Sequence, residues 1–472
     1  MLKIKMKWAN FLHFYQPPTQ KKTWVNRIAA EAYRPIVSGL TKQPDNKITL
    51  NINGILLELL DAYGDGDIIE TLRQLLERGQ IELTGSAKFH PLLPFLPKDE
   101  IIRQIQLNEE TLKKYFGKAW QKKGFFPPEM GFDKNTARIV KELDYQWIIA
   151  DELSFPREKR PIDYGKIYQI DGLPDFYIYF RERKISWIIL SGQVGTGELL
   201  IKGLAERLQK DEYLITAMDG ETFGHHRPGL EQLLFEIHSF REITNVLISE
   251  LPAYFPLVQK INPEPSTWAL MEKDIELKKP FSRWKDPDNA IHEAQWKLTN
   301  LAIEAIHSAD KNSPRYLSAR LALDRALHSD QFWWASARPW WSIEMIERGA
   351  KELYDAVAKT PQIADDKKKR ALELYHSIVF TAFDWQRSGL VDELAKKEDE
   401  DIRQRTDQGL PNLPKKEVYK MIKKLTEEME TVVKKQEFER AAQIRDRITE
   451  LKNYQSDASN PDFSSEGSRE WD

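Results

Sequence analysis

Residues 214–226 read LITAMDGETFGHH, a short apolar run that ends in two carboxylates and two imidazoles. A short apolar run bounded by polar residues is typical of a strand buried on both faces. Similar runs occur at 6–14, 47–52, 147–150 and 187–190, and amphipathic helical stretches separate them. This alternation, up to about residue 260, predicts a parallel sheet surrounded by helices. A closed barrel is favoured, and a doubly wound open sheet is the alternative.

The pattern changes after residue 262, where long helical stretches replace the alternation. The run KKEDEDIRQRTDQ, starting at Lys396, has almost no apolar residue and indicates a solvated connection. The sequence therefore predicts five parts: an α/β barrel at 1–262, a helical domain at 263–392, a charged linker at 393–414, a helical hairpin at 415–454 and a disordered tail at 455–472.

Composition excludes several classes of protein. The 472 residues contain 70 Lys and Arg against 73 Asp and Glu, a formal net charge of −3, which argues against a nucleic-acid partner. Cysteine is absent, so disulfides and thiolate metal sites are excluded. The N-terminus lacks the apolar segment of a signal peptide, and no apolar stretch approaches the roughly 18 residues of a membrane span. We therefore expect a cytoplasmic protein.

Four polar segments follow predicted strands: HFYQPP at 13–18, GQIELTGSAKFHPLLPFLP at 79–97, GFFPPEMGF at 124–132 and AMDGETFGHH at 217–226. Sites in α/β proteins form at the carboxyl ends of parallel strands, so these segments are expected to meet. Two carboxyl groups at one edge are what glycosidic bond cleavage requires. Each residue also has a structural interpretation, as a satisfied core histidine, a buried ion-pair partner or a helix cap.

In this order the segments resemble the motifs of glycoside hydrolase family 57, and LHSDQFWW at 327–334 resembles the fifth and last motif. The resemblance covers about residues 6–340. It implies a distorted (β/α)7 barrel followed by a helical region, and a retaining mechanism on α-glucans or maltooligosaccharides, with no cofactor and no metal.

The resemblance also implies roles for individual residues. Glu129 matches the nucleophile and Asp219 the general acid/base. The residues that match the sugar-binding positions are His13, Gln16, His90, Glu221, Asp330, Trp333 and Trp334. Two positions depart from the family pattern, because Tyr15 replaces a histidine and Phe126 replaces a tryptophan. These departures change the sugar-binding surface and therefore bear on substrate specificity. They do not bear on the catalytic chemistry, since both carboxyl groups remain.

The protein contains 14 tryptophans, which are either core residues or surfaces on which sugar rings stack. The segment 333–341, WWASARPWW, is the candidate acceptor site, and a buried aromatic cluster is its alternative.

Hydrolysis and 4-α-glucanotransfer are both open, as are the α-amylase, amylopullulanase and branching types. A metal-dependent carbohydrate hydrolase or deacetylase is a rival, with ligands drawn from His13, His90, His225, His226 and Asp219. A non-catalytic glucan-binding scaffold is a second rival.

Residues 423–452 resemble the UVR motif, an antiparallel helical pair that binds another such pair, and FERAAQIRD at 438–446 carries the match. Each helix has one apolar face. The predicted face residues are Val418, Ile422, Leu425, Met429 and Val432, then Phe438, Ala441, Ile444, Ile448 and Leu451. A hairpin alone buries little area, so we expect a protein partner, self-association or the rest of the chain to cover it.

Overall fold

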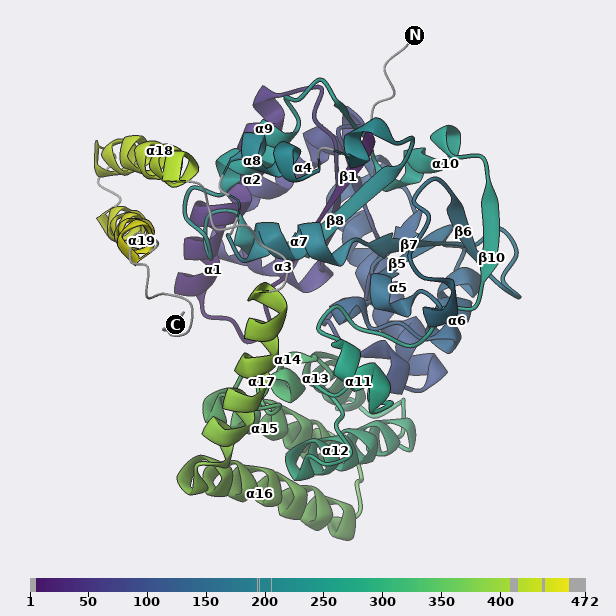
Figure 1. The fold of residues 1–472 in the computed structure, drawn as a ribbon. Coiled ribbons are helices and arrows are strands. Elements are labelled where there is room, and N and C mark those ends of the chain that lie inside the picture. The colour runs from purple at the N-terminus through teal and green to yellow at the C-terminus, as the bar shows by residue number, and fades with distance from the viewer. Residues whose placement is uncertain are drawn as a thin grey trace.

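The structure, a computed structural model, describes residues 6–192, 194, 196–204, 206–407, 415–434 and 438–457. The chain forms an α/β body, a helical region below it and a separate helical hairpin (Figure 1). The predicted tail begins inside the last helix, and its residues from 458 onward lie outside the described part.

Seven strands form the ring of the barrel in the described part of the chain. The strand β1 pairs in parallel with β2 and β8, β2 with β3, and β5 with both β4 and β7. A parallel bridge between Gly85 and Phe125 joins the first group to β4, and the amide of Glu182 donates to the carbonyl of Ile215 (2.8 Å) between β7 and β8. The ring strands are β1 (Met6–Phe14), β2 (Ile48–Ile52), β3 (Ile81–Leu83), β4 (Gly124–Phe125), β5 (Trp147–Asp151), β7 (Tyr177–Arg181) and β8 (Tyr213–Asp219).

The predicted distorted barrel is therefore confirmed, and the distortion lies where short contacts replace full ladders. Every residue of β2 and of β5 is buried, as expected for strands covered on both faces. Three further strands lie beside the ring: β6 (Ile167–Ile170), β9 (Ile243–Asn245) and β10 (Val258–Ile261).

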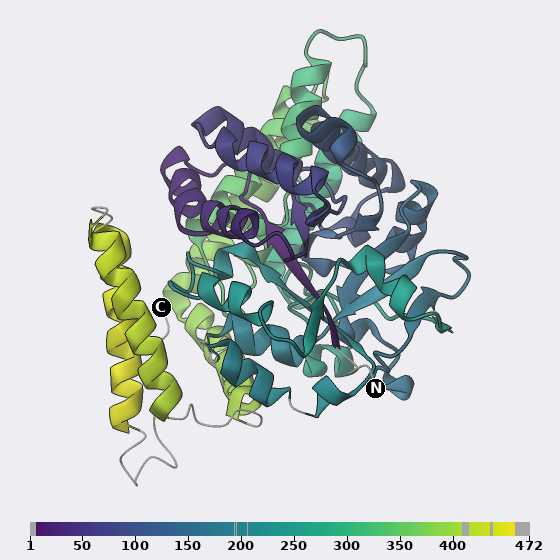
Figure 2. The same ribbon diagram turned by 90° about the horizontal axis from the view of Figure 1, so that it is seen from above.

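Helices surround the strands, as Figure 2 shows from above. A typical example is α6, which begins where Asp133 accepts a hydrogen bond from the amide of Thr136 (2.7 Å) and buries Ala137 and Val140. The barrel helices are α1 (Lys22–Ile28), the π-helix η1 (Ala29–Tyr33), α2 (Arg34–Lys42), α3 (Gly54–Tyr63), α4 (Gly66–Glu77), α5 (Lys98–Phe116), α6 (Lys134–Glu142), α7 (Arg183–Leu190), α8 (Gly197–Gly203), α9 (Glu231–Ile237) and α10 (Leu251–Tyr254).

One predicted strand is wrong. Residues 187–190 belong to α7, because Glu182 caps that helix by accepting a hydrogen bond from the amide of Ile185 (2.6 Å). Its buried apolar residues, Ile185 and Ile189, are four apart, which is a helical spacing. The ring strand of this part of the chain is β7, ten residues earlier.

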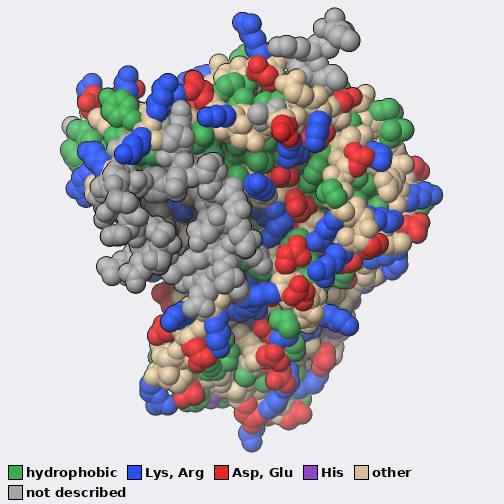
Figure 3. Space-filling model, viewed as in Figure 1, with side chains coloured by type: hydrophobic (Ala, Val, Ile, Leu, Met, Phe, Trp, Pro, Cys, Tyr) green, Lys and Arg blue, Asp and Glu red, His purple; other side chains and the backbone are tan. Residues whose placement is uncertain are grey.

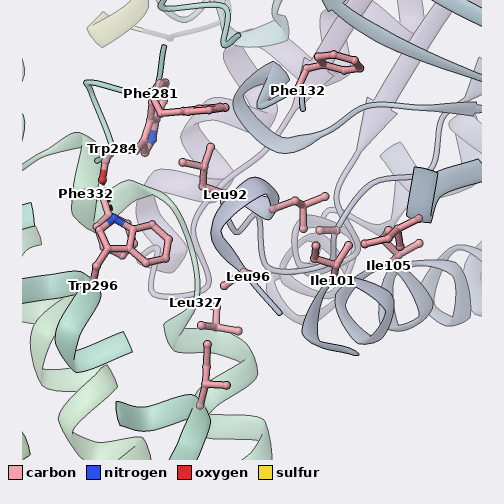
Figure 4. Packing of buried hydrophobic residues seen from close by; sticks show 14 of the residues in the cluster. Leu92, Leu96, Ile101, Ile105, Phe132, Phe281, Trp284, Trp296, Leu327 and Phe332 are labelled. Atoms are coloured by element: carbon pink, nitrogen blue, oxygen red, sulfur yellow. Dashed lines mark hydrogen bonds between the residues drawn. The ribbon is translucent and has the colours of Figure 1, made fainter. Parts of the chain in front are cut away.

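The helical region shares a core with the barrel. Leu92, Ile101 and Phe132 of the barrel belong to one buried cluster with Trp284 and Phe332 of the helical region, and Figure 4 shows members of this cluster on both sides of the junction. This common core crosses the proposed boundary at 262 and holds the helical region against the strand ends. The helices are α11 (Glu272–Glu276), α12 (Ala290–His307), α13 (Tyr316–Ala326), α14 (Asp330–Trp333), α15 (Ile343–Lys359), α16 (Asp365–Ser388) and α17 (Leu390–Asp407).

The predicted charged linker is corrected by α17, which continues as a helix to Asp407. Glu398 of this helix is buried and forms ion pairs with Arg283 and Arg338. A charge run that looks solvated in the sequence thus contributes a buried acid to a network of arginines. Residues 408–414 lie outside the described part.

The hairpin consists of α18 (Lys415–Lys434) and α19 (Phe438–Asp457), which stand beside the barrel in Figure 2. Their apolar faces pack against each other through Val418, Leu425, Ile444 and Ile448. Phe438 was predicted on this face but is 65% exposed.

The hairpin also contacts the barrel, through ion pairs of Lys420 with Glu198 and of Lys424 with Glu236.

Basic and acidic side chains are mixed over the face shown in Figure 3. Among the described residues, no helix combines the length and the apolar character that a membrane crossing requires.

Candidate active site

The polar segment 13–18 begins at the end of β1, which pairs with β2 on one side and with β8 on the other. His13, near the end of β1, is in register with Asn51 of β2 on one side and with Asp219 of β8 on the other. Parallel pairing places these three residues side by side at the carboxyl edge of the barrel.

Glu129 follows β4 in a left-handed conformation, with φ 60° and ψ 17°. This conformation is uncommon for a residue with a side chain, and such residues concentrate at functional sites. The indole N–H of Trp268 donates to Oε2 (2.9 Å), and the hydroxyl of Ser329 lies 3.1 Å from Oε1. The backbone amide of Trp268 also donates to the carbonyl of Glu129 (3.1 Å), so both ends of the residue are held.

Two histidines connect the strand ends to Ser329. The Nε2 atoms of His13 and His90 are 3.1 Å apart, and Nδ1 of His90 lies 3.0 Å from the hydroxyl of Ser329. Nδ1 of His13 lies 2.8 Å from Oδ1 of Asn51. Both ring nitrogens of each histidine are therefore engaged by protein groups.

Asp330, from α14, lies at the same site. It accepts hydrogen bonds from the hydroxyl of Tyr15 (2.6 Å) and from Nδ1 of His328 (3.0 Å). The second ring nitrogen of His328 lies 3.1 Å from Glu352. Burial opposes a charge on His328, but the two carboxylates outweigh it and raise its pKa to about 9. Tyr15 also stacks on His90, with ring centroids 3.9 Å apart, so this departure from the family pattern fills space beside Asp330.

Asp219 and Glu221 occupy the end of β8 and the short turn η8 (Gly220–Thr222). Glu221 is buried, and its carboxylate accepts hydrogen bonds from Tyr33 and from Gln16 (3.0 Å). Tyr33 comes from the π-helix η1, a helical irregularity that is often found at functional sites. The side chain of Asp219 accepts no hydrogen bond from the backbone of the following turn, so the interpretation of Asp219 as a helix cap is not supported.

Arg181, at the end of β7, is a residue that the sequence analysis missed. Its positive charge lowers the pKa of Asp219, and its guanidinium lies 3.4 Å from Asp151. The signal was present, because YIYF at 177–180 is a β-prone aromatic run that ends in this arginine. Trp268, Ser329 and Asn51 were missed as well. Ser329 stands next to Asp330 inside the segment 327–334, which was the available signal, whereas no sequence spacing marked Trp268 or Asn51.

Burial raises the pKa of both candidate catalytic carboxyls. The pKa of Glu129 is raised to about 8 by burial and then by the charge of Asp330, with a further contribution from Asp219. The pKa of Asp219 is raised to about 6 by burial, against the lowering effect of Arg181. Burial and the charge of Asp219 raise the pKa of Glu221 to about 8. Neighbouring carboxyls with separated pKa values are typical of acid–base sites.

The predicted aromatic residues form a cluster that begins on α14, the helix that starts with Asp330. Trp333 packs on Trp284 (ring centroids 5.1 Å apart) and stacks on Trp340 (6.1 Å). The ring of Trp334 meets Trp340 edge to face at 6.0 Å. Trp284 is fully buried and Trp340 is 47% exposed, so the cluster is core at one end and surface at the other.

The proposed metal ligands do not gather into one set. His225 is paired with Glu31 (2.5 Å), and His13 and His90 are engaged as described above. Within the described ranges, the one group of three donors close enough to share an ion is Asp99, Glu100 and His307, which the strand-end site does not include.

Comparison with known proteins gives two family matches. Residues 8–253, more than half of the chain, match glycosyl hydrolase family 57, and residues 420–454 match the UvrB/uvrC motif. Both resemblances inferred from the sequence are thereby confirmed.

The α-amylase of Pyrococcus horikoshii is 23% identical over 285 residues, which are 58% of this chain and 43% of that protein. The chain thus spans less than half the length of this relative.

Two solved structures share the fold. The 4-α-glucanotransferase of Thermococcus litoralis superimposes with a TM-score of 0.58 at 17% identity, over 75% of this chain and 59% of that one. A branching enzyme of Pyrococcus horikoshii gives a TM-score of 0.58 at 16% identity, over 80% of this chain and 96% of the other.

Proposed function

Because the chain belongs to glycosyl hydrolase family 57, we propose that it is a retaining α-glucan hydrolase or 4-α-glucanotransferase, with Glu129 as nucleophile and Asp219 as general acid/base. One observation carries the assignment of the two residues. They come from distant segments of the chain, yet Asp219 is in register with His13 at the strand ends, and His13 is connected to Glu129 through His90 and Ser329. The names of the relatives, α-amylase and 4-α-glucanotransferase, support α-glucans as the substrate class.

In the proposed reaction, protonated Asp219 donates its proton to the glycosidic oxygen while Glu129 attacks the anomeric carbon. The bond from this carbon to the leaving sugar breaks, and a bond to a carboxylate oxygen of Glu129 forms. Asp219 then removes a proton from water or from a sugar hydroxyl, which releases the glycosyl group by hydrolysis or by transfer.

The pKa values impose a condition on this mechanism. With Glu129 near 8 and Asp219 near 6, a single shared proton resides mainly on Glu129 in the free protein. The reactive form has the proton on Asp219 instead. The difference between the two pKa values therefore favours the unreactive arrangement in the free protein. The donors on Glu129, Trp268 and Ser329, act against this difference because they stabilise the ionised nucleophile.

The choice between hydrolysis and transfer depends on whether a sugar or water reaches the intermediate. The half-exposed Trp340 and its neighbours Trp333 and Trp334 are the proposed acceptor surface, because aromatic faces beside Asp330 suit sugar stacking.

The direct test is incubation of the full chain with maltooligosaccharides and with amylopectin, followed by analysis of product lengths. Shorter products alone indicate hydrolysis, longer products indicate transfer, and new branch points indicate branching. Glu129→Gln should abolish turnover while binding of maltooligosaccharide persists. The matched control is Glu110→Gln, an exposed acid on α5 that should leave turnover unchanged.

Turnover by Glu129→Gln at the wild-type rate would remove the nucleophile assignment. Binding without turnover by either form would favour the non-catalytic scaffold. Loss of wild-type activity on treatment with a chelator would favour the metal-dependent alternative.

A further inference from the structure

A continuous row of buried side chains leads from the end of β2 to the proposed nucleophile. It begins at Asn51 and passes through His13, His90 and Ser329 to Glu129, with successive polar atoms 2.8, 3.1, 3.0 and 3.1 Å apart. The first four residues are at most 2% exposed. Water therefore does not replace these contacts, and the direction of each hydrogen bond depends on its neighbours.

The two imidazoles make this row directional. Burial lowers the pKa of His13 well below its usual value and that of His90 to about 4, so both rings are neutral at physiological pH. A neutral imidazole has one N–H and one lone pair, and a hydroxyl has a single proton to donate. If one ring donates from Nδ1 it must accept at Nε2, and its partner is constrained in turn.

Only two arrangements satisfy every contact. An ionised Glu129 can only accept, so Ser329 donates to it and His90 donates from Nδ1 to Ser329. His13 must then donate from Nε2 to His90 and accept at Nδ1 from the amide of Asn51. When Glu129 is protonated, it can donate to Ser329 and every bond reverses, which leaves His13 donating from Nδ1 to Asn51.

The amide of Asn51, at the far end of the row from Glu129, can form the hydrogen bonds of either arrangement. The structure places Oδ1 of Asn51 against Nδ1 of His13 and Nδ2 of Asn51 3.1 Å from the hydroxyl of Thr84, the amide orientation in which His13 donates from Nδ1. Rotation of the amide gives the other state, because the hydroxyl of Thr84 can donate as well as accept.

We propose that Asn51, His13, His90 and Ser329 form a positioning relay in which the ionisation of Glu129 and the tautomers of the two histidines change together. Overall one proton leaves Glu129 for solvent, and in the same change the ring proton of His90 moves from Nε2 to Nδ1 and that of His13 from Nδ1 to Nε2, so each ring stays neutral. None of the members needs to contact the sugar through a ring nitrogen. Asn51 and Ser329 are thus positioning residues for the nucleophile, a role that rests on the proposed function.

Other charges also face the relay and must be separated from its effect. Glu129 faces Asp330 from α14 and Asp219 from β8, and both raise its pKa. His90 faces Asp330 and His328, which act in opposite directions. In the described part of the chain, the hydroxyl of Ser329 joins the ring of His90 to Glu129 by hydrogen bonds, whereas Nδ1 of His90 and Oε1 of Glu129 are 3.7 Å apart, so a change at Ser329 removes the hydrogen-bonded link.

The test is long-range proton–nitrogen NMR on the full chain labelled with ¹⁵N-histidine, between pH 6 and pH 10. In the wild type, the protonated nitrogen of His90 should change from Nε2 to Nδ1 as Glu129 ionises, and His13 should change in parallel. Ser329→Ala should abolish this change, and Ser329→Thr, which keeps the hydroxyl, should restore it. Assignments come from His13→Gln and His90→Gln.

Kinetics supply a second readout. Loss of a donor to a charged group is worth a factor of about ten, so Ser329→Ala should lower the plateau of kcat/KM by about tenfold and move its upper pH limb to higher pH. Ser329→Thr should reverse both changes.

Tautomers that do not change with pH in the wild type, or that change equally in Ser329→Ala, would overturn the relay. Activity on α-glucans with unchanged tautomers would therefore refute the relay and leave the proposed function standing. An inactive wild type that still shows the change would refute the function and support the relay.

Discussion

Glu129 and Asp219 lie at the same end of the barrel but in different surroundings. Glu129 is held by two side-chain donors, its backbone is in a rare conformation, and its pKa is near 8. Asp219 has, among the described residues, no hydrogen bond to its side chain, and Arg181 moderates its pKa. A nucleophile must attack from one fixed position, whereas an acid must first donate and then accept a proton. The difference suits those two tasks.

The largest expected effect distinguishes the proposed roles of the two carboxyls, because only the acid is needed less when the substrate has a good leaving group. Asp219→Asn should lower kcat/KM on maltooligosaccharides, which reports formation of the glycosyl intermediate, by roughly 10²–10⁴-fold, the usual contribution of general acid catalysis. The loss should be much smaller on an aryl α-glucoside whose phenolate leaves without protonation. Glu129→Gln should lose both activities. If Asp219→Asn lost the same factor of activity on both substrates, Asp219 would not be the acid.

The second prediction is a bell-shaped dependence of kcat/KM on pH. Below about pH 6 both carboxyls are protonated and Glu129 cannot attack, and above about pH 8 both are ionised and no acid remains. Activity should therefore be greatest near about pH 7 and should fall about tenfold per pH unit outside the limbs. Rates with purified maltooligosaccharide across pH 4–10 check this, and a profile with a single limb would contradict a shared proton.

Trp268→Phe tests the donors on Glu129. Without the indole N–H the ionised form of the proposed nucleophile is less stable, so the pKa of Glu129 should rise. The plateau of kcat/KM should fall by about tenfold, the upper limb should move to higher pH, and the rates should converge with the wild type above that limb. The control is Trp187→Phe, at a tryptophan that is 39% exposed on α7. A uniform loss at every pH would indicate misfolding instead.

The smallest kinetic effect is expected from a change at Tyr33, which contacts Glu221 on the turn after Asp219. Tyr33→Phe removes the hydroxyl that donates to Glu221, which is already mostly protonated at neutral pH because its pKa is near 8. The rate should change by less than about threefold, while the free energy of unfolding falls by about 1–2 kcal/mol because a buried carboxyl loses a partner. Denaturant titration against Tyr254→Phe, an exposed tyrosine, measures the difference.

Much of the site could be anticipated because its residues follow strands. Once LITAMD is a strand of a parallel sheet, Asp219 must lie at its carboxyl end, and the same holds for His13. The position of β7 was missed, because residues 187–190 are as apolar as a strand and only the capping of α7 by Glu182 decides the matter. The charged run around Glu398 was misread for a similar reason, since burial of an acid depends on arginines far away in the sequence.

Local pattern determined most of the strands and helices and which polar residues stand at their ends, because these depend on periodicity and on neighbouring residues. The partners of each carboxyl were decided only by tertiary structure. Trp268 and Ser329 are 139 and 200 residues from Glu129, and they reach it because the helical region shares its core with the barrel. Hydrogen bonds and pKa shifts act over a few ångströms of space, and a sequence does not state which distant residues lie within that range.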